Sequence, residues 1–404
     1  MPPADPSTSP VPPWQPSWPW RASSTIVMGV TGFLCRSFIY GLNRTEVHRL
    51  DNLLRVIDER NEVYRRQRGL ITVSNHIMMS RMDDPLVWGA LPLRYHWNAS
   101  NMRWGLGSYD ICFKNKFSSA FFTLGQVLPT HRNAHSTHGG LFQPTIVQAI
   151  RLLSDPQAST GSSSESSIAS SAVSSTHASP PDHSLSSPDL ADPFSSNHLT
   201  YSTNGTDTFP APAAYASRKH SWVHIFPEGK IHQKSDKTMR YFKWGVARLI
   251  LESEPCPDML PIWLEGFDQC LHESRGWPRA IPRSGANISI SFGEKVDMES
   301  RFGDLRERWK MIKESALREG GGRGTLAVSE IGVLEDEELK YGAEAVELRK
   351  EVTMRVRQEV LEVRKSRGLP DEDPKAGLVE TWRAEGGLGK TEGRMDDGSW
   401  VRDT

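Results

Sequence analysis

The sequence has few cysteines and no excess of either charge. Its four cysteines are scattered, and none belongs to a CxxC pair: Cys35, Cys112, Cys256 and Cys270. This spacing argues against a disulfide framework and against a cysteine-based zinc site, so we expect unpaired, buried thiols. The formal net charge is only −1, and the sequence contains no nucleic-acid-recognition motif. We therefore expect no nucleic-acid partner.

A secretory signal and a long apolar run are also missing. The first basic residue is Arg21, and no cleavage pattern follows an apolar run, so no cleavable signal is recognisable. The most apolar stretch runs from Ile26 to Tyr40 and contains Arg36. Because a membrane-spanning helix needs about 20 apolar residues, we interpret this stretch as an interfacial, in-plane anchor. A core helix is the alternative.

Composition divides the chain into segments. The lead is rich in proline, which prevents helix formation, and in tryptophan, which favours the lipid–water boundary. A serine-rich insertion lacks the apolar surface that folding requires. The expected segments are a flexible Pro/Trp-rich lead (1–22), membrane-associated helices (23–68), a folded domain in two parts (69–154 and 220–366), the disordered serine-rich insertion (155–219) and a loose tail (367–404).

The folded domain mixes strand and helix patterns. Short apolar or alternating runs predict strands, and apolar residues at helical spacing predict helices. The predicted strands are residues 70–74, 221–226, 259–263 and 286–292, and the predicted helices are residues 44–68, 239–252 and 343–366. The basic helix 239–252 suits either an anionic membrane surface or packing on a sheet.

His76 directly follows the predicted strand 70–74, and Asp83 and Asp84 come shortly after it. A carboxylate bonded to one imidazole nitrogen makes the other nitrogen more basic. Such a base can take a proton from an alcohol that attacks an ester. We predict that His76 is a general base and that Asp83 is its partner. The alternatives are a structural histidine and an aspartate that caps a helix beginning near Pro85.

A second polar turn follows the predicted strand 221–226, with the sequence Phe-Pro-Glu228-Gly229-Lys230. Gly229 allows close backbone approach, and Lys230 supplies a positive charge for phosphate. Glu228 cannot bind phosphate itself, so we expect it to orient a hydroxyl or to fix the loop. The alternative is an ordinary Pro-Glu-Gly turn.

Arg132 ends a third stretch, residues 125–132, and its forked N–H donors suit phosphate. His131, His135 and His138 lie nearby, but no cysteine or carboxylate completes a set of metal ligands around them. We interpret them as solvated loop histidines and expect neither a metal site nor another cofactor.

In chain order, His76 to Asp83, Gly125 to Arg132, Phe226 to Lys230 and Leu260-Pro261-Ile262 resemble the four sequence blocks of the glycerolphosphate acyltransferase superfamily. Within it, the chain is most similar to the tafazzin family in its fungal form, through Met82-Asp-Asp-Pro-Leu-Val-Trp-Gly89, Phe226 to Ile231 and Gly266-Phe-Asp268. The likeness covers most of residues 14–375, apart from the serine-rich insertion. It implies an α/β fold, with a mixed sheet surrounded by helices and N-terminal membrane-associated helices. It also makes the two-part domain an acyltransferase domain.

The resemblance implies a transacylase that works without coenzyme A, moves acyl chains between a phospholipid and a lysophospholipid, and thereby remodels cardiolipin. The implied partners are cardiolipin, monolysocardiolipin and a membrane surface, with a higher-order assembly as a further option. By resemblance alone, the protein would be a peripheral or monotopic protein of the mitochondrial inner or outer membrane, facing the intermembrane space. The implied catalytic residues are His76 and Asp83, and the implied substrate-binding residues are Arg132, Glu228, Gly229 and Lys230.

The spacing between His76 and Asp83 departs from the family, which has four residues there, whereas this chain has six. In a continuous helix, seven steps of about 1.5 Å would place the two residues about 10 Å apart, too far for a hydrogen bond. The pair therefore requires the two extra residues to loop out. An acyl-CoA-dependent lysophospholipid acyltransferase and a catalytically silent lipid-binding scaffold are the alternative functions.

Overall fold

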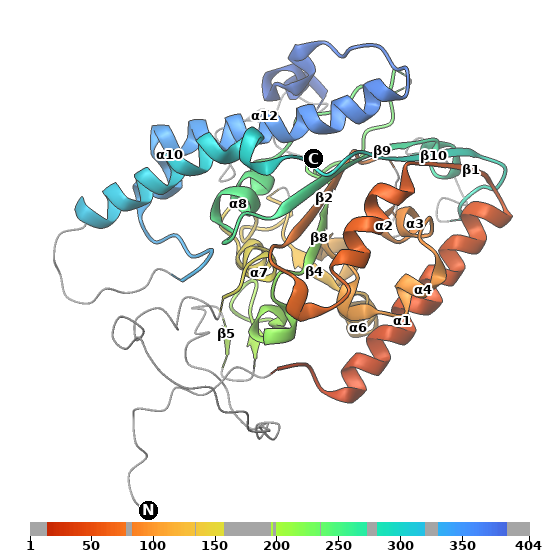
Figure 1. The fold of residues 1–404 in the computed structure, drawn as a ribbon, viewed down its shortest axis with the longest axis horizontal. Coiled ribbons are helices and arrows are strands. Elements are labelled where there is room, and N and C mark those ends of the chain that lie inside the picture. The colour runs from red at the N-terminus through yellow and green to blue at the C-terminus, as the bar shows by residue number, and fades with distance from the viewer. Residues whose placement is uncertain are drawn as a thin grey trace, which may run out of the picture.

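A seven-stranded mixed sheet forms the centre of the fold (Figure 1). The computed structural model describes residues 14–77, 83–133, 135–156, 195–196, 199–234, 236–272, 281–319 and 330–385. The strands of the sheet are β1 (Arg44–His48), β2 (Leu70–Ser74), β3 (Trp104–Ser108), β4 (Val127–Thr130), β8 (Trp222–Ile225), β9 (Asp258–Glu265) and β10 (Asn287–Phe292). Their spatial order is β1-β10-β9-β2-β8-β3-β4. The predicted α/β fold with a mixed sheet is confirmed.

Most neighbouring strands run parallel, so their carboxyl ends meet at one edge of the sheet. β2 pairs in parallel with β8 and β9, and β3 pairs in parallel with β8 and β4. β10 is antiparallel to β9, and β1 is parallel to β10. The ends of β2, β3, β4, β8 and β9 and the beginnings of β1 and β10 therefore share one edge, which we call the carboxyl edge. In open α/β sheets, ligands bind in the crevice outside the carboxyl ends of the strands.

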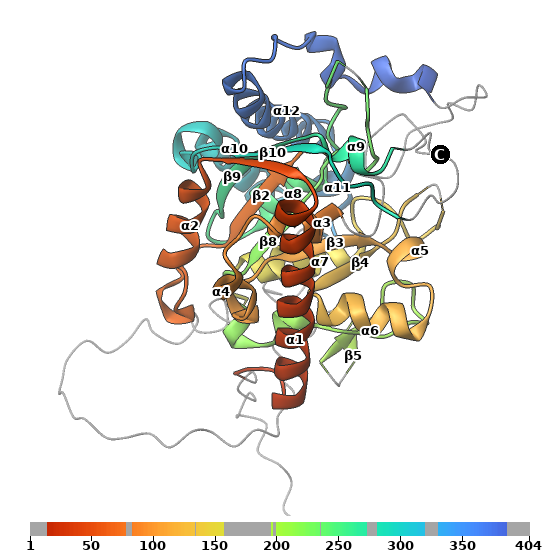
Figure 2. The same ribbon diagram turned by 90° about the vertical axis from the view of Figure 1, so that its right-hand side faces the viewer.

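Helices cover both faces of the sheet, as Figures 1 and 2 show from two directions. One face, with Val73 and Met259, packs against α7, α8, α10 and α12. The other, with Leu70 and Ile262, packs against α1, α2, α3 and α4. The helices are α1 (Trp18–Arg36), α2 (Leu50–Glu59), α3 (Asp83–Trp88), α4 (Leu93–His96), α5 (Tyr109–Cys112), α6 (Lys116–Leu124), α7 (Pro144–Leu153), α8 (Gly245–Glu252), α9 (Phe267–Cys270), α10 (Met298–Glu319), α11 (Glu337–Tyr341) and α12 (Ala343–Ser366).

α1 and the π-helical turn Ser37–Gly41 that continues it form one helical stretch of 24 residues. By length and composition, this stretch is long and apolar enough to cross a membrane. One side of α1 is buried against the domain, where Gly32 lies so close to the ring of His96 that an added Cβ would lie 2.4 Å from it. The opposite side exposes four large apolar side chains, those of Ile26, Val30, Phe33 and Leu34. One side of α1 therefore packs against the domain, and the opposite, apolar side is exposed.

Arg36, the charge inside this apolar stretch, has a structural role. Its guanidinium donates hydrogen bonds at 3.1–3.2 Å to the backbone carbonyls of three residues that follow α3, namely Gly89, Ala90 and Leu91. Carbonyls at a helix end lack partners within the helix. Arg36 supplies those partners and fastens α1 to α3, so the charge does not weaken the apolar character of the exposed face.

Residues 44–68 do not form the single charged helix that we predicted. Their first part is β1, which pairs with β10 along its whole length. α2 begins after it and carries the predicted apolar stripe, with Leu53 and Ile57 buried. The prediction was wrong for residues 44–48 because an edge strand with charged residues on its outer face resembles a solvated helix in sequence.

Residues 199–219, predicted to be the disordered end of the insertion, are folded. They contain β6 (Thr200–Tyr201) and β7 (Phe209–Pro210), which with β5 (Ser195–Ser196) form a three-stranded sheet. Tyr201 and Phe209 are buried in a cluster with Phe113 and Phe122. These aromatic side chains provide the apolar surface that the serine-rich stretch lacks. Residues 157–194 and 197–198 of the predicted insertion lie outside the described residues.

The first part of the tail, predicted to be loose, packs on the domain. Trp382 is only 2% exposed and lies in a small cluster with Tyr241 and Ala376. The prediction failed here because one buried tryptophan anchors a segment that otherwise has a polar, loop-like composition. The rest of the tail, residues 386–404, and residues 1–13 of the lead lie outside the described residues.

The prediction of a helix over 343–366 is confirmed by α12, whose valines face the core. The helix predicted over 239–252 begins only at Gly245, and α8 is buried from Val246 to Glu252. Its basic residue Arg248 forms a buried ion pair with Glu252. Packing on the sheet, and not contact with a membrane, therefore explains this apolar stripe.

The four cysteines are unpaired, as predicted; Cys256 is half-buried and the other three are buried. Burial raises the pKa of the Cys35 thiol to about 12, which keeps it protonated and unreactive. Among the described residues, no cluster of three or more histidine, cysteine or acidic side chains could hold a metal ion.

The close approach of Gly32 to His96 predicts the effect of adding one methyl group. Gly32→Ala places a Cβ inside the His96 ring contact, and we expect the resulting overpacking to cost about 1–3 kcal/mol of unfolding free energy. Thermal unfolding in detergent measures this as a lowered Tm. Gly41→Ala is the matched control, because no atom lies within 4 Å of an added Cβ there. Equal Tm values for the two variants would contradict this account of how α1 docks.

Candidate active site

His76 and Glu228 meet at the carboxyl edge. β2 and β8 pair in parallel with Val73 opposite Ile225, and His76 and Glu228 each lie three residues beyond that pair. The main-chain N–H of His76 donates to Oε1 of Glu228 at 2.7 Å. Two of the motifs singled out in the sequence are therefore joined by a direct hydrogen bond.

Glu228 uses both of its carboxylate oxygens on backbone groups. Besides the N–H of His76, it accepts the N–H of Arg240 through Oε2 at 2.9 Å. The side chain is 1% exposed. Burial raises the pKa of Glu228 to about 7, against the opposite effect of the two backbone N–H groups. Of the two roles that we predicted for Glu228, this geometry supports fixing the loop.

The turn after β8 has the shape that its glycine predicts. Gly229 has φ +61° and donates its N–H to the carbonyl of Phe226 at 3.0 Å. An added Cβ would lie 2.8 Å from the side chain of Lys243. The next residue, Lys230, is half-buried. The turn therefore brings two lysines, Lys230 and Lys243, close to the backbone that follows Glu228.

The ring of His76 is half-buried and stacks on Phe226, with ring centroids 4.8 Å apart. Beneath Phe226 lies His224, which contacts it edge-on at 4.6 Å. His224 is 1% exposed, and its Nδ1 hydrogen-bonds to the hydroxyl of Thr72 at 2.9 Å. Burial lowers the pKa of His224 to about 4, so its imidazole is neutral at physiological pH. We missed His224 in the sequence, although strand alternation from Trp222 places it on the same face.

Of the two aspartates at the start of α3, the structure describes the side chain of Asp84 but only the backbone of Asp83. Asp84 accepts hydrogen bonds from the guanidinium of Arg103 and from the indole N–H of Trp88. Arg103 also donates to the carbonyl of Gly125 at 2.9 Å, so Asp84 ties α3 to the segment before β4. The backbone of Asp83 begins α3. Its side chain and residues 78–82 lie outside the described part, so the predicted contact between His76 and Asp83 stays a prediction.

Arg132 lies at the same edge but away from His76. It follows β4, three strands from β2 in the sheet, which corresponds to about 14 Å at the usual strand spacing. Asp110, which we missed in the sequence, accepts from Nε of Arg132 at 3.1 Å and from Nη2 at 2.5 Å. Partial burial opposes ionisation of Asp110, but these hydrogen bonds and one from Ser108 lower its pKa. The guanidinium is therefore held in a fixed orientation at the carboxyl edge.

The neighbouring histidine of Arg132 is engaged within the protein. His131 stacks on Tyr109 with ring centroids 4.4 Å apart, and its Nε2 hydrogen-bonds to the hydroxyl of Thr203 at 2.8 Å. Burial lowers the pKa of His131. The prediction of a solvated loop histidine was wrong for His131, because the folded part of the insertion covers it, whereas His135 and His138 are exposed as predicted.

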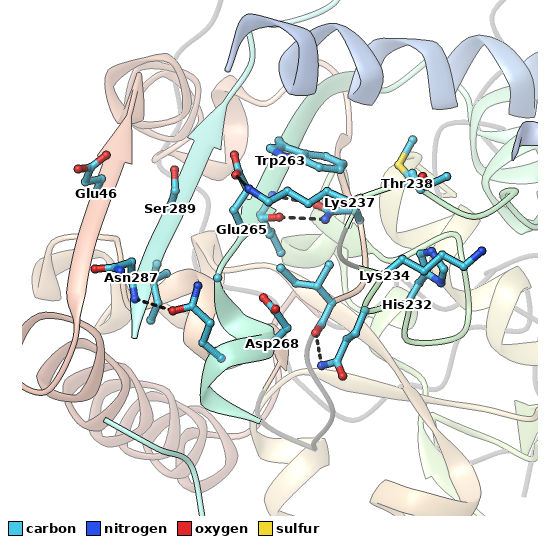
Figure 3. A pocket seen from close by; sticks show the side chains of 18 of the residues that line it. Glu46, His232, Lys234, Lys237, Thr238, Trp263, Glu265, Asp268, Asn287 and Ser289 are labelled. Carbon is cyan, nitrogen blue, oxygen red and sulfur yellow. Dashed lines mark hydrogen bonds and ion pairs between the residues drawn. The ribbon is translucent and has the colours of Figure 1, made fainter. Parts of the chain in front are cut away.

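A pocket of about 420 Å³ opens at the carboxyl edge beside Glu228 (Figure 3). It lies between the exposed face of β1, β10 and β9 and the loop of residues 232–239, and Asn75 and Ile77 line it on either side of His76. Basic and acidic side chains both line it: the basic ones are Arg44, Lys234 and Lys237, and the acidic ones are Glu46, Glu265 and Asp268. The volume and the polar lining suit the head group of a small ligand.

Comparison with known proteins identifies the family. No protein-family model matches the chain. Tafazzin from Saccharomyces cerevisiae is 32% identical to it over 393 residues, which cover 94% of this chain and 87% of the yeast protein. The chain belongs to the tafazzin family. The resemblance inferred from the sequence motifs is thereby confirmed.

Two weaker similarities were also found. Tafazzin from Drosophila melanogaster is 28% identical over 293 residues, covering 72% of this chain and 56% of the fly protein. The structure of the 1-acyl-sn-glycerophosphate acyltransferase PlsC from Thermotoga maritima aligns with 75% of this chain and 82% of that chain, with a TM-score of 0.35 and 13% identity. As a member of the tafazzin family, the protein is an acyltransferase.

The burial of Glu228 predicts a dependence of stability on pH. Because burial raises the pKa of Glu228 to about 7 from the ordinary 4.5, the folded chain holds this proton more tightly than the unfolded chain does. The resulting stabilisation is complete below the unfolded pKa and is lost as the pH rises through about 7. We therefore expect the unfolding free energy of the natural chain, relative to that of Glu228→Gln, to fall between about pH 5 and about pH 8.

Urea denaturation in detergent, repeated across this pH range, measures the difference. Glu380→Gln is the control, because Glu380 is exposed at the surface, and its difference from the natural chain should stay constant. A constant difference for Glu228→Gln as well would show that Glu228 titrates as it does in water.

Proposed function

We propose that the protein is a phospholipid–lysophospholipid transacylase that works without coenzyme A and remodels the acyl chains of cardiolipin. The observation that carries the proposal is the placement of His76 at the carboxyl edge, fixed through its own N–H by Glu228 and beside a polar pocket. Membership of the tafazzin family supports phospholipids as the substrates. The choice of cardiolipin and the independence from coenzyme A rest on that family likeness.

In the proposed reaction, His76 acts as the general base. It takes the proton from a glycerol hydroxyl of the lysophospholipid, and the oxygen forms a bond to the ester carbonyl carbon of the donor phospholipid. The tetrahedral intermediate collapses when the bond between that carbon and the donor's glycerol oxygen breaks. This oxygen recovers the proton from the imidazolium, so that a new lysophospholipid leaves. No protein nucleophile is required, because the substrate alcohol attacks directly.

Asp83 is the proposed partner of His76, and the engagement of Asp84 supports this choice. Asp84 is occupied by Arg103 and Trp88 and serves to fasten α3. Of the two aspartates, this leaves Asp83 for the imidazole. A carboxylate at this position would orient the ring and stabilise the imidazolium that forms during the reaction.

The proposed substrate-binding residues lie along the carboxyl edge. Arg132 offers a guanidinium oriented by Asp110, suited to a lipid phosphate. Gly229 and Lys230 provide a tight turn with a positive charge, close to the point where Glu228 fixes the backbone of His76. The mixed charges of the pocket suit the polar head group of a phospholipid.

We propose that the apolar face of α1 contacts the membrane. Next to α1 lies α6, to which Ser24 is joined by a hydrogen bond to the carbonyl of Leu124 at 2.7 Å. α6 exposes Phe117 and Phe121, 85% and 41% respectively. A helix with one buried side and one exposed apolar side fits an in-plane anchor, so the protein would be monotopic or peripheral. Its location in mitochondrial membranes, facing the intermembrane space, is proposed from the family likeness alone.

His76→Ala is the direct test of the catalytic proposal. Removal of a general base costs about 10²–10⁴ in rate, so we expect acyl transfer from labelled phospholipid to lysocardiolipin to fall by that factor. His272→Ala, at an exposed histidine, is the control and should transfer at the normal rate. Activity retained by His76→Ala would reject His76 as the base.

The same assay, run with and without acyl-coenzyme A, separates the alternative functions. Transfer only when acyl-coenzyme A is present would indicate an acyl-CoA-dependent acyltransferase. No transfer under either condition would indicate a silent lipid-binding scaffold, which the six-residue spacing between His76 and Asp83 favours as the second candidate.

If the exposed apolar side of α1 contacts the membrane, a charge placed at Phe33 should weaken membrane binding. Phe33 is 55% exposed on the outer side of α1, and insertion of such a side chain into lipid contributes about 1.5–3 kcal/mol. We expect Phe33→Glu to weaken binding to phospholipid vesicles about tenfold or more. Tyr64→Glu, at an exposed aromatic residue away from α1, should bind normally in the same flotation assay. Equal binding by both variants would remove α1 from the membrane contact.

A further inference from the structure

The segment of residues 370–382, which we call the C-terminal strap, lies against the loop that walls the pocket. Trp382 is buried, and its ring contacts His232 edge-on at 4.8 Å. The guanidinium of Arg240 lies over the same ring at 4.9 Å. The indole N–H of Trp382 donates to the carbonyl of Ala376 at 2.7 Å, which closes the strap on itself. The strap is therefore fixed to the loop of residues 232–240.

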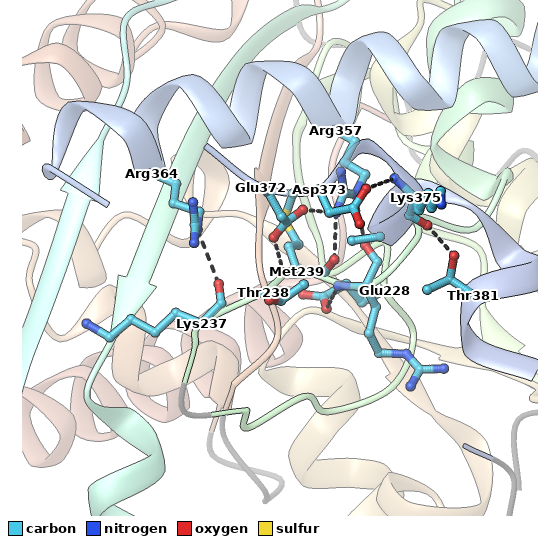
Figure 4. A network of polar contacts seen from close by, with 12 residues as sticks. Glu228, Lys237, Thr238, Met239, Arg357, Arg364, Glu372, Asp373, Lys375 and Thr381 are labelled. Atoms are coloured by element: carbon cyan, nitrogen blue, oxygen red, sulfur yellow. Dashed lines mark hydrogen bonds and ion pairs between the residues drawn. The ribbon is translucent and has the colours of Figure 1, made fainter. Parts of the chain in front are cut away.

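Within the strap, Glu372 reaches the backbone of that loop (Figure 4). Its Oε1 accepts the N–H of Met239 at 2.5 Å, and its Oε2 forms an ion pair with Arg357 of α12. Arg357 in turn donates to the carbonyl of Met239 at 2.6 Å and to that of Arg240 at 3.0 Å. The two side chains are only 2% and 4% exposed. A buried ion pair thus holds the N–H of Met239 and the C=O groups of Met239 and Arg240.

From this loop, a continuous series of hydrogen bonds leads to the proposed base. Arg240, the residue after Met239, donates its N–H to Oε2 of Glu228. Glu228 then accepts the N–H of His76 through Oε1. Two buried carboxylates in series, Glu372 and Glu228, therefore connect the strap and α12 to the main chain of the catalytic histidine.

We propose that Glu372 is a positioning residue for acyl transfer, acting on His76 through Met239–Arg240 and Glu228. The proposal rests on the proposed function, because it requires His76 to be the base. Neither Glu372 nor Arg357 lines the pocket, so Glu372 would not touch a substrate bound there and acts on the orientation of the base. A misplaced catalytic group lowers the rate of the chemical step even when its identity is unchanged.

Glu372→Gln tests the proposal with little change of volume. It keeps an oxygen for the N–H of Met239 but loses the ion pair with Arg357. We expect kcat for acyl transfer to fall about tenfold or more, with KM for the lysophospholipid within about twofold of normal. Asp371→Asn is the matched control: Asp371 is the preceding residue, its side chain is 75% exposed, and its ion pair is with Lys365 at the surface. This control should keep the normal kcat.

A double-mutant cycle on kcat with Glu228→Gln distinguishes a positioning role of Glu372 from a merely structural one. If Glu372 acts through Glu228, the double variant should be no more than about threefold slower than the slower single variant, because residues in one network are not additive. Multiplication of the two single effects would overturn the proposal, and so would a normal kcat for Glu372→Gln.

Circular dichroism and thermal unfolding establish that each variant is folded. If Glu372→Gln does not fold, Arg357→Lys keeps the charge of the pair while losing the forked donors, and the same fall in kcat at normal KM is expected. Activity in His76→Ala would defeat the proposed function. Loss of activity in His76→Ala together with a normal kcat in Glu372→Gln, or in Arg357→Lys where Glu372→Gln does not fold, would defeat this inference alone.

Discussion

The structure of the carboxyl edge beside His76 depends on one carboxylate that accepts two backbone N–H groups. Glu228 is joined to His76 on one side and to Arg240 on the other, at 2.7 and 2.9 Å. A buried carboxyl group without partners would be strongly unfavourable, and one with two good donors instead becomes a rigid junction. The end of β2, the turn after β8 and the loop before α8 are consequently held in one arrangement. Most of the candidate site is positioned relative to this junction.

The sheet makes this junction available. Because β2 and β8 are parallel neighbours, residues at equal distances beyond their ends face each other, although 152 positions separate them in the chain. A second junction, the ion pair between Asp84 and Arg103, fixes α3 over the same region. Beneath both lies His224, kept neutral by burial. The half-exposed ring of His76 thus rests on a neutral aromatic layer, while the charged groups lie around it at the edge.

Sequence patterns predicted the site better where it follows strand ends than elsewhere. His76 and Glu228 were both expected because each follows an apolar strand, and parallel strands deliver such residues to a common edge. The link from Glu372 could not be expected, because it is a contact between distant segments with no local signature. β1 was mistaken for helix because its outer face is charged. The packing of the tail was missed because it depends on the single side chain of Trp382.

The two-sided character of α1 has a consequence for handling the protein. Its outer stripe of Ile26, Val30, Phe33 and Leu34 is part of a helix whose inner side completes the core. In buffer without an amphiphile this stripe would be exposed to water, and the protein would aggregate through it. An amphiphile that binds this stripe on the folded chain more tightly than it binds the unfolded chain adds to the stability of the fold. The melting temperature of this enzyme therefore depends on the amphiphile as well as on the chain. Exchanging one amphiphile for another should shift the melting temperature, as a mutation would.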